Sequence, residues 1–127
     1  MRTRHFRELL VWQKAMFLTK QVYCQTATLP KSEIIGLQSQ MRRAAVSIPS
    51  NIAEGHGRLS DHLLRVFLAQ ARGSLYELET QIQLCHDLDL IPPDAVKDLF
   101  ELCNEVARMI NGLLKTLKPK ETKQSAG

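Results

Sequence analysis

The amino-acid sequence predicts an all-α protein, an antiparallel up-down-up-down four-helix bundle whose second helix is kinked by a proline. Two observations lead to this fold class. Apolar residues recur at alternating steps of three and four in four separate segments, which is the spacing of one helix face. The connections between these segments are short, and short connections between helices favour antiparallel neighbours. No segment shows the pattern of a strand.

The first predicted helix covers residues 6–27. The series that we expect to face the core is Leu9, Trp12, Met16, Thr19 and Tyr23. A second apolar series repeats at similar spacing on a neighbouring face: Val11, Ala15, Leu18 and Val22. Because one buried stripe needs only one series, the extra apolar width indicates a second contact surface, such as one between subunits. Pro30 disfavours the helical conformation at the residue before it and ends the segment.

The second predicted helix starts at Ser32 or Glu33, with Ser32 as a candidate N-cap, and ends at residues 55–57. Its seam is Ile34, Leu37, Met41, Ala44, Ile48 and Ile52. Pro49 falls inside this pattern. A proline there removes one backbone hydrogen bond and its ring crowds the preceding turn, so we expect a kink. A break of the helix at Pro49 is the competing interpretation.

The third and fourth predicted helices keep a heptad spacing throughout. The third opens at Ser60, a good N-cap, and its seam is Leu64, Leu68, Ala71, Leu75, Leu78, Ile82 and Cys85. The fourth has Pro93 or Asp94 in its first turn, and its seam is Val96, Leu99, Cys103, Val106, Ile110, Leu113 and Leu117. We therefore expect one bundle domain at residues 1–118 and a disordered polar tail at residues 119–127.

Composition predicts a cytoplasmic protein. No apolar run approaches the roughly 18 residues that a membrane-spanning helix needs, and no uninterrupted apolar run follows the basic N-terminus as in a signal peptide. The three cysteines are widely spaced, and each stands where an aliphatic residue would fit the pattern. We interpret Cys24, Cys85 and Cys103 as buried, reduced thiols.

The net charge of +4 conceals an uneven distribution along the chain. Residues 1–76 hold eleven Lys and Arg against four Asp and Glu, and residues 77–114 hold two against eight. The last thirteen residues hold four Lys and one Glu. Such asymmetry predicts a molecule with one basic and one acidic region, or oppositely charged helices that lie side by side.

The sequence offers no candidate for a catalytic, cofactor-binding or metal site. The Glu-x-x-His pattern of di-iron bundles is absent, as is a glycine-rich phosphate loop with its lysine. Ser47, Ser50 and His56 lie close in sequence, but no third group is evident to orient a nucleophile and its base. We therefore expect no enzymatic activity, no cofactor and no small-molecule substrate.

Arginines supply the candidate nucleic-acid-binding residues. Arg42 and Arg43 are adjacent on the second helix, and Arg58, Arg65 and Arg72 repeat every seven residues along one stripe of the third helix and its entry. A stripe of arginines with few local counter-charges suits phosphate backbones, and the lysines from residue 115 onward would assist. The alternative is a solvated face, or ion pairs with acidic residues of neighbouring helices: Glu77, Glu79, Glu101 and Glu105.

Three runs of residues are similar to those of a known family. Residues 6–15 read Phe-Arg-Glu-Leu-Leu-Val-Trp-Gln-Lys-Ala, and residues 73–81 read Gly-Ser-Leu-Tyr-Glu-Leu-Glu-Thr-Gln. The most specific run, residues 40–55, reads Gln-Met-Arg-Arg-Ala-Ala-Val-Ser-Ile-Pro-Ser-Asn-Ile-Ala-Glu-Gly. Over residues 6–91 the chain resembles the four-helix-bundle proteins encoded within intervening sequences of bacterial 23S rRNA genes.

The resemblance implies a four-helix bundle that assembles as a homopentamer. It also implies kinship with the accessory proteins of diversity-generating retroelements, whose basic pentamers bind nucleic acid and a reverse transcriptase. Our leading hypothesis is a structural protein that binds RNA or DNA through nonspecific phosphate contacts. The rival hypothesis is a protein-interaction scaffold, in which the kink and the acidic fourth helix dock a partner such as a reverse transcriptase.

Overall fold

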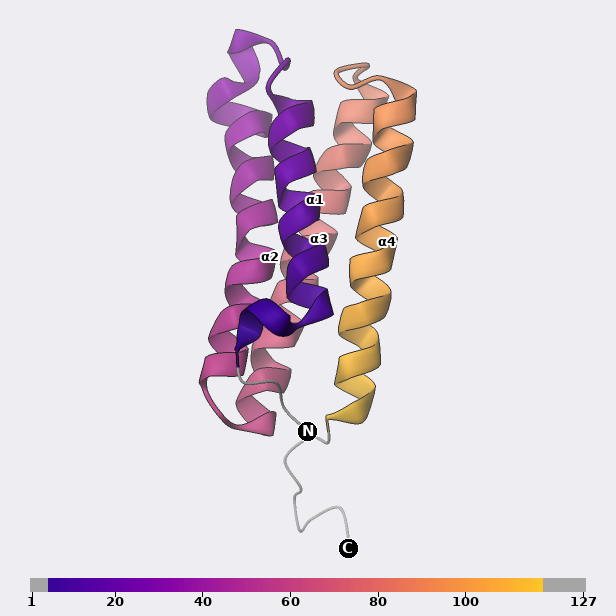
Figure 1. Ribbon diagram of the computed structural model, residues 1–127. Helices are drawn as coiled ribbons and strands as arrows, with labels where there is room; N and C mark the ends of the chain where they lie inside the picture. Colours follow the sequence, from indigo (N-terminus) through magenta and orange to yellow (C-terminus); the bar gives the residue numbers. More distant parts are fainter. Residues whose placement is uncertain (1–4, 118–127) are drawn as a thin grey trace, which may run out of the picture.

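The computed structural model describes residues 5–117, which form four α-helices and contain no strand (Figure 1). The helices are α1 (Leu10–Thr26), α2 (Ser39–Gly57), α3 (Asp61–Asp87) and α4 (Pro93–Thr116). Short helical turns precede α1 and α2: the 3-10 turns η1 (Phe6–Glu8) and η2 (Lys31–Glu33), and the π-helical turn η3 (Ile34–Gln38). The predicted all-α, four-helix class is confirmed. The predicted tail lies outside the described residues.

The helices follow one another around the bundle, and sequential helices run in opposite directions (Figure 1). Contacts between α2 and α3 illustrate the reversal. The sulfur atoms of Met41, at the start of α2, and Cys85, at the end of α3, lie 3.5 Å apart. Further along α2 the hydroxyl of Ser47 lies 2.8 Å from the hydroxyl of Ser74, earlier in α3.

A single apolar core runs the length of the bundle. The α3 seam from Leu64 to Cys85 is buried as predicted, and the α2 seam is buried from Met41 to Ile52, whereas Ile34, the first residue of the predicted α2 seam, is 47% exposed. In α4 the seam is buried as predicted from Val96 to Ile110, but in the next turn Leu114 is buried where the sequence predicts Leu113. Each fully buried aliphatic side chain contributes about 1.5–3 kcal/mol relative to an exposed one, so these seams fix the rotation of each helix about its axis.

The core face of α1 differs from the predicted one. Val11, Ala15, Leu18 and Val22 are at most 3% exposed, whereas Tyr23 of the predicted seam is 43% exposed. Trp12 and Met16 are only partly buried. Both series are apolar and share one spacing, so periodicity alone could not decide between them. The series with compact aliphatic side chains packs most deeply. Of the predicted series, Thr19 is buried at 8% exposed, and Leu9 and Trp12 pack partly against the core.

The α-helical part of α2 begins later than predicted, at Ser39. In η3 Gly36 departs from helical geometry (φ −84°, ψ −108°), and the Glu33 side chain, not that of Ser32, accepts a hydrogen bond from the Leu37 amide. Beyond this irregular start, α2 continues through Pro49 to Gly57. The alternative of a helix break at Pro49 is therefore wrong, and the kink stays a prediction.

One cysteine lies elsewhere than predicted. Cys24 is exposed, while Cys85 and Cys103 are buried as expected. His56, which the sequence places beside a loop, is only 6% exposed. Within residues 5–117 no helix is long and apolar enough to cross a membrane.

We expect opposite effects from alanine at two helical glycines. A Cβ atom at Gly55 would lie 2.7 Å from the Cβ of Phe67, whereas one at Gly73 would meet no atom within 4 Å. Gly55→Ala should lower the free energy of unfolding by about 1–3 kcal/mol through overpacking. Gly73→Ala should raise it by about 0.5–1 kcal/mol, because alanine loses less backbone entropy in a helix. Urea unfolding followed by circular dichroism measures both. Equal effects of the two variants would contradict this close approach of α2 and α3.

Candidate nucleic-acid interface

Two of the predicted arginines meet in a groove between α3 and α4. The groove has a volume of about 370 Å³ and is lined by Arg65, Ala69, Arg72, Asn111, Leu114 and Lys115. Arg65 and Arg72 are two helical turns apart on α3, while Lys115 comes from the last turn of α4. The structure therefore gathers three cationic side chains at one place on the surface. We call this site the α3/α4 groove.

Arg65 reaches across the groove to the end of α4. Its Nη1 donates to the carbonyl oxygens of Leu114 at 2.6 Å and Leu117 at 3.0 Å. Carbonyls in the last turn of a helix have no partner within the helix and form the negative end of its dipole. Arg65 therefore caps the C-terminal end of α4 and at the same time places its cationic group at one end of the groove.

Arg72 is held by a neutral acceptor. Its Nη1 donates to Oδ1 of Asn111 on α4 at 2.9 Å. An amide oxygen orients the guanidinium without cancelling its charge. Because a guanidinium has five N–H donors, most of those on Arg72 stay available for another ligand.

The other predicted arginines lie apart from this groove. Arg42 caps the C-terminal end of α1 much as Arg65 caps that of α4. Its Nε donates to Oγ1 of Thr26 at 3.0 Å, its Nη2 donates to the carbonyl of Tyr23 at 3.2 Å, and its guanidinium carbon lies 4.4 Å from the centre of the Tyr23 ring. Arg43, the next residue, is exposed and makes no hydrogen bond or ion pair within residues 5–117.

Arg58 is the one predicted arginine that a carboxylate holds in the described part of the chain. Its Nη2 lies 2.9 Å from Oε2 of Glu54, and its guanidinium carbon lies 5.2 Å from the centre of the Phe67 ring. Although Arg58 shares the seven-residue spacing of Arg65 and Arg72, it follows the end of α2 and does not line the groove. Of the three arginines spaced seven residues apart, only Arg65 and Arg72 therefore belong to one site.

The sequence left open the alternative that oppositely charged helices neutralise each other through ion pairs. Few of the charged side chains that the structure describes are paired in this way. Over residues 5–117, a single ion pair joins two helices, between Nζ of Lys14 on α1 and Oε2 of Glu105 on α4 at 3.0 Å. None of the five arginines pairs with the acidic residues considered as partners. Most of the described charged side chains in the basic and acidic parts of the chain are therefore not neutralised by ion pairs between helices.

The buried thiols are poor nucleophiles and metal ligands in this environment. Burial, with a smaller effect of the nearby Glu79 charge, raises the pKa of Cys103 to about 12. Burial and the charge of Glu33 also raise the pKa of Cys85. Both thiols are thus protonated at neutral pH. The described residues contain no group of three or more His, Cys, Asp or Glu side chains placed to hold a metal ion.

Comparison with known proteins agrees with the resemblance seen in the sequence. The model of the 23S rRNA-intervening sequence protein family matches residues 7–112, a range that includes the predicted arginines and most of α4. No curated protein matches the chain. The predicted link to retroelement accessory proteins stays a prediction.

Arg65 and Arg43 should differ in their effect on stability. Arg65→Gln should lower the free energy of unfolding by about 1–2 kcal/mol, because the carbonyls at the end of α4 lose a charged donor. Arg43→Gln should change it by less than about 0.5 kcal/mol, as for exposed residues without partners. Denaturant unfolding of both variants is the measurement. A neutral effect of Arg65→Gln would show that the end of α4 does not need this donor.

Glu79 should make the protein less stable as pH rises above the usual carboxyl range. Burial raises the pKa of Glu79 above its ordinary value of 4.5, so the folded state binds this proton more tightly than the unfolded state. The stability that protonation provides is full below the unfolded pKa and is lost as pH rises through the folded pKa. Glu79→Gln should therefore raise the free energy of unfolding at pH 7, with a smaller gain at pH 4. Urea unfolding at the two pH values tests this, and an equal or larger gain at pH 4 would contradict it.

Proposed function

Because the chain belongs to the 23S rRNA-intervening sequence protein family, we propose that it is a non-enzymatic cytoplasmic protein that binds nucleic acid through the α3/α4 groove. The observation that supports this function most directly is the convergence of Arg65, Arg72 and Lys115 in one groove. The hydrogen-bond acceptors of the two arginines there are neutral oxygens. Because no carboxylate within residues 5–117 neutralises Arg65 or Arg72, the positive charge of both guanidinium groups is available to anions.

Phosphate oxygens suit the groove for electrostatic and geometric reasons. Guanidinium groups bind phosphate through paired N–H donors, and an ammonium adds a point charge. Arg65 and Arg72 each commit a single nitrogen atom, Nη1, to the bonds that position them. Those bonds already restrain both guanidinium groups, which lowers the entropy lost when a phosphate is bound.

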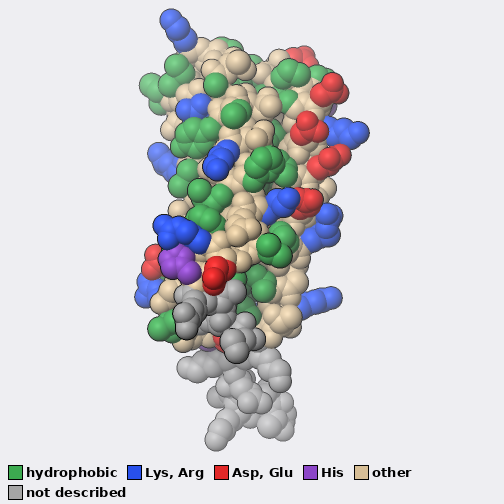
Figure 2. All heavy atoms as spheres, in the orientation of Figure 1, with side chains coloured by type: hydrophobic (Ala, Val, Ile, Leu, Met, Phe, Trp, Pro, Cys, Tyr) green, Lys and Arg blue, Asp and Glu red, His purple; other side chains and the backbone are tan. Residues whose placement is uncertain are grey.

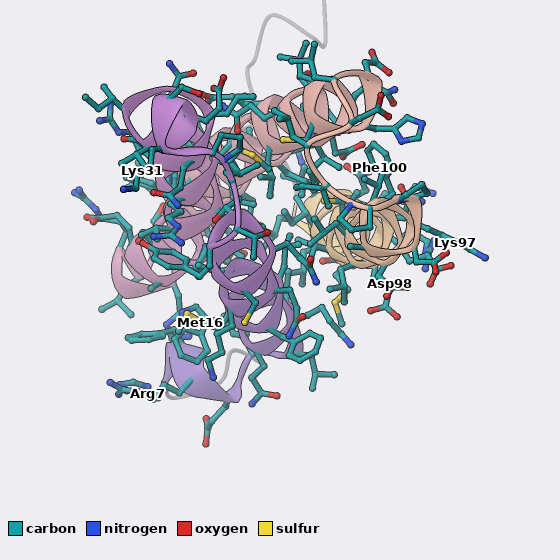
Figure 3. All side chains as sticks on the ribbon, turned by 90° about the horizontal axis from the view of Figure 1, so that it is seen from above. Arg7, Met16, Lys31, Lys97, Asp98 and Phe100 are labelled. Atoms are coloured by element: carbon teal, nitrogen blue, oxygen red, sulfur yellow. The ribbon has the colours of Figure 1, made fainter. Side chains whose placement is uncertain are left out.

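Arg43 is a further candidate contact on a separate surface. It lies on α2, which is diagonally opposite α4 in the bundle (Figure 3). Arg42 and Arg58, by contrast, are engaged with Tyr23 and Glu54. We therefore propose Arg65, Arg72 and Lys115 as the main contacts, with Arg43 acting independently of them.

Self-association would bring several such grooves onto one particle and raise the avidity for a long polyanion. We propose that copies contact one another through the groove between α1 and α2, as part of the homopentamer that the resemblance implies. This groove is lined by Trp12, Met16, Thr19, Val46, Pro49, Ser50 and Ala53. Hydrophobic side chains spread over this face of the molecule (Figure 2). Apolar surface rimmed by polar residues is typical of contacts between subunits.

The alternative function is a scaffold or accessory subunit for a protein partner such as a reverse transcriptase. A scaffold of this kind would not need the α3/α4 groove to bind polyanions. The same charge variants therefore distinguish the two functions.

Removing two cationic side chains from the groove should lower the affinity for RNA and make that affinity less dependent on salt concentration. For a single-stranded RNA, each phosphate contact contributes about 0.7 to the slope of log affinity against log salt, so Arg72→Gln with Lys115→Gln should reduce the slope by about 1.4. The matched control is Lys20→Gln with Lys97→Gln, which removes the same charge from two exposed lysines elsewhere. Fluorescence anisotropy over a salt series gives both slopes. Equal losses in the two double variants, or no RNA binding by the wild type at low salt, would exclude the proposal.

A charge placed in the α1/α2 groove should dissociate the oligomer. Val46 on α2 is 41% exposed and lines this groove, whereas Val66 on α3 is 37% exposed and does not. Val46→Glu should reduce the mass measured by light scattering to that of one chain, with unchanged helical content, while Val66→Glu should leave the mass of the wild type. A monomeric wild-type protein would rule out self-association.

A further inference from the structure

We propose that the furrow between α1 and α4 is a docking site for a basic, amphipathic helix of a partner protein. Its upper part is lined by Phe17, Gln21, Asp98, Glu101, Leu102 and Glu105. Its lower part is lined by Leu10, Gln13, Lys14, Phe17 and Met109. Phe17 lines both parts. An ion pair of 3.0 Å between Lys14 of the lower part and Glu105 of the upper part joins the two walls, and we call the two parts together the α1/α4 furrow. This site lies on the opposite side of α4 from the basic groove and does not depend on nucleic-acid binding.

The furrow has the length of a short helix. Its lining extends from Leu10 to Gln21 along α1 and from Asp98 to Met109 along α4. Each span covers twelve residues, and the eleven steps between its ends correspond to about 16 Å at the helical rise per residue. A ligand helix of about three turns would therefore lie along the furrow without overhanging either end.

The floor of the furrow is apolar and partly open to solvent. The ring of Phe17 is 48% exposed, and Leu10 is 68% exposed. Leu102 and Met109 are partly buried at the base, where they pack against the core. Aromatic and aliphatic side chains in such a position are suited to an apolar ridge on a ligand, because each contact removes further apolar surface from water.

The wall that α4 contributes is acidic. Asp98 and Glu101 are exposed and have no ion pair within residues 5–117, while Glu105 contacts Lys14 at 3.0 Å. Acidic side chains gather over the upper half of α4 in the space-filling view, and Asp98 points away from the bundle (Figures 2 and 3). These carboxylates repel a phosphate backbone and attract Lys and Arg side chains. The chemistry of the furrow therefore selects a basic polypeptide over a nucleic acid.

The backbone of the walls favours a helical ligand over an extended one. The furrow is built from the interiors of α1 and α4, where the N–H and C=O groups already bond within each helix. An extended segment would find no backbone partners there, in contrast to the exposed edge of a sheet. Recognition must use side chains, and an amphipathic helix presents apolar and basic residues together along one edge.

The test uses the full-length protein and a 12-residue peptide of Lys and Leu, with its leucines at helical spacing and its ends blocked. Peptide binding, measured by fluorescence anisotropy, should weaken at least fivefold in Asp98→Asn with Glu101→Gln, since two ion pairs are lost. Phe17→Ser should also weaken it at least fivefold, because the apolar floor is lost. The matched charge control is Glu77→Gln with Asp87→Asn, which neutralises two exposed carboxylates on α3 and should change the affinity less than twofold. A peptide of the same composition with its leucines spread around the helix should bind at least fivefold more weakly.

Independence from the basic groove gives a second measurement. Arg72→Gln with Lys115→Gln should change the affinity for the peptide less than twofold, and neither set of furrow variants should weaken RNA binding. Three results would overturn the proposal. Equal weakening in the control variant would mean that only net charge matters. Tighter peptide binding after removal of residues 118–127 would identify the chain's own basic tail as the occupant. A change of oligomeric mass in Phe17→Ser would identify a second copy of the chain as the occupant.

Discussion

Burial of the apolar seams is the constraint on which every surface feature of this protein depends. The seam of α3 is buried from Leu64 to Cys85, and that of α4 from Val96 to Ile110. A helix whose seam must face the core has no remaining freedom of rotation, so its other residues acquire fixed directions. For α3 this turns Arg65 and Arg72 toward α4. For α4 it turns Asp98 and Glu101 to one side and Asn111 and Lys115 to the other.

Helix ends explain why two arginines have structural partners. In an antiparallel bundle, the beginning of one helix lies beside the end of its neighbour. Arg42 near the start of α2 reaches the last turn of α1, and Arg65 near the start of α3 reaches the last turn of α4. Each donates to carbonyl groups at the end of a helix, where the negative end of the helix dipole lies. The arginine charge thus stabilises the fold, and in the case of Arg65 it also borders the groove.

The two sides of α4 differ in charge, and this polarity separates two kinds of recognition. One edge borders a groove with Arg65, Arg72 and Lys115, and the opposite edge borders a furrow with Asp98 and Glu101. Since the Lys14–Glu105 contact is the one ion pair that joins helices within residues 5–117, the charges are not spent on internal pairing. Anionic and cationic ligands would meet different faces of the same helix without competing.

Sequence alone determined the fold class, the seam of α3, the seam of α4 as far as Ile110, and the uneven charge, because heptad spacing and composition are local properties of the chain. It did not determine which apolar face of α1 packs, since Val11–Val22 and Leu9–Tyr23 have the same period. It also could not tell Arg58 from Arg65, because equal spacing says nothing of whether the nearest acceptor is Glu54 or the end of α4. Tertiary structure decided these points, since helix rotation and the neighbours of a side chain follow from packing between segments far apart in the sequence.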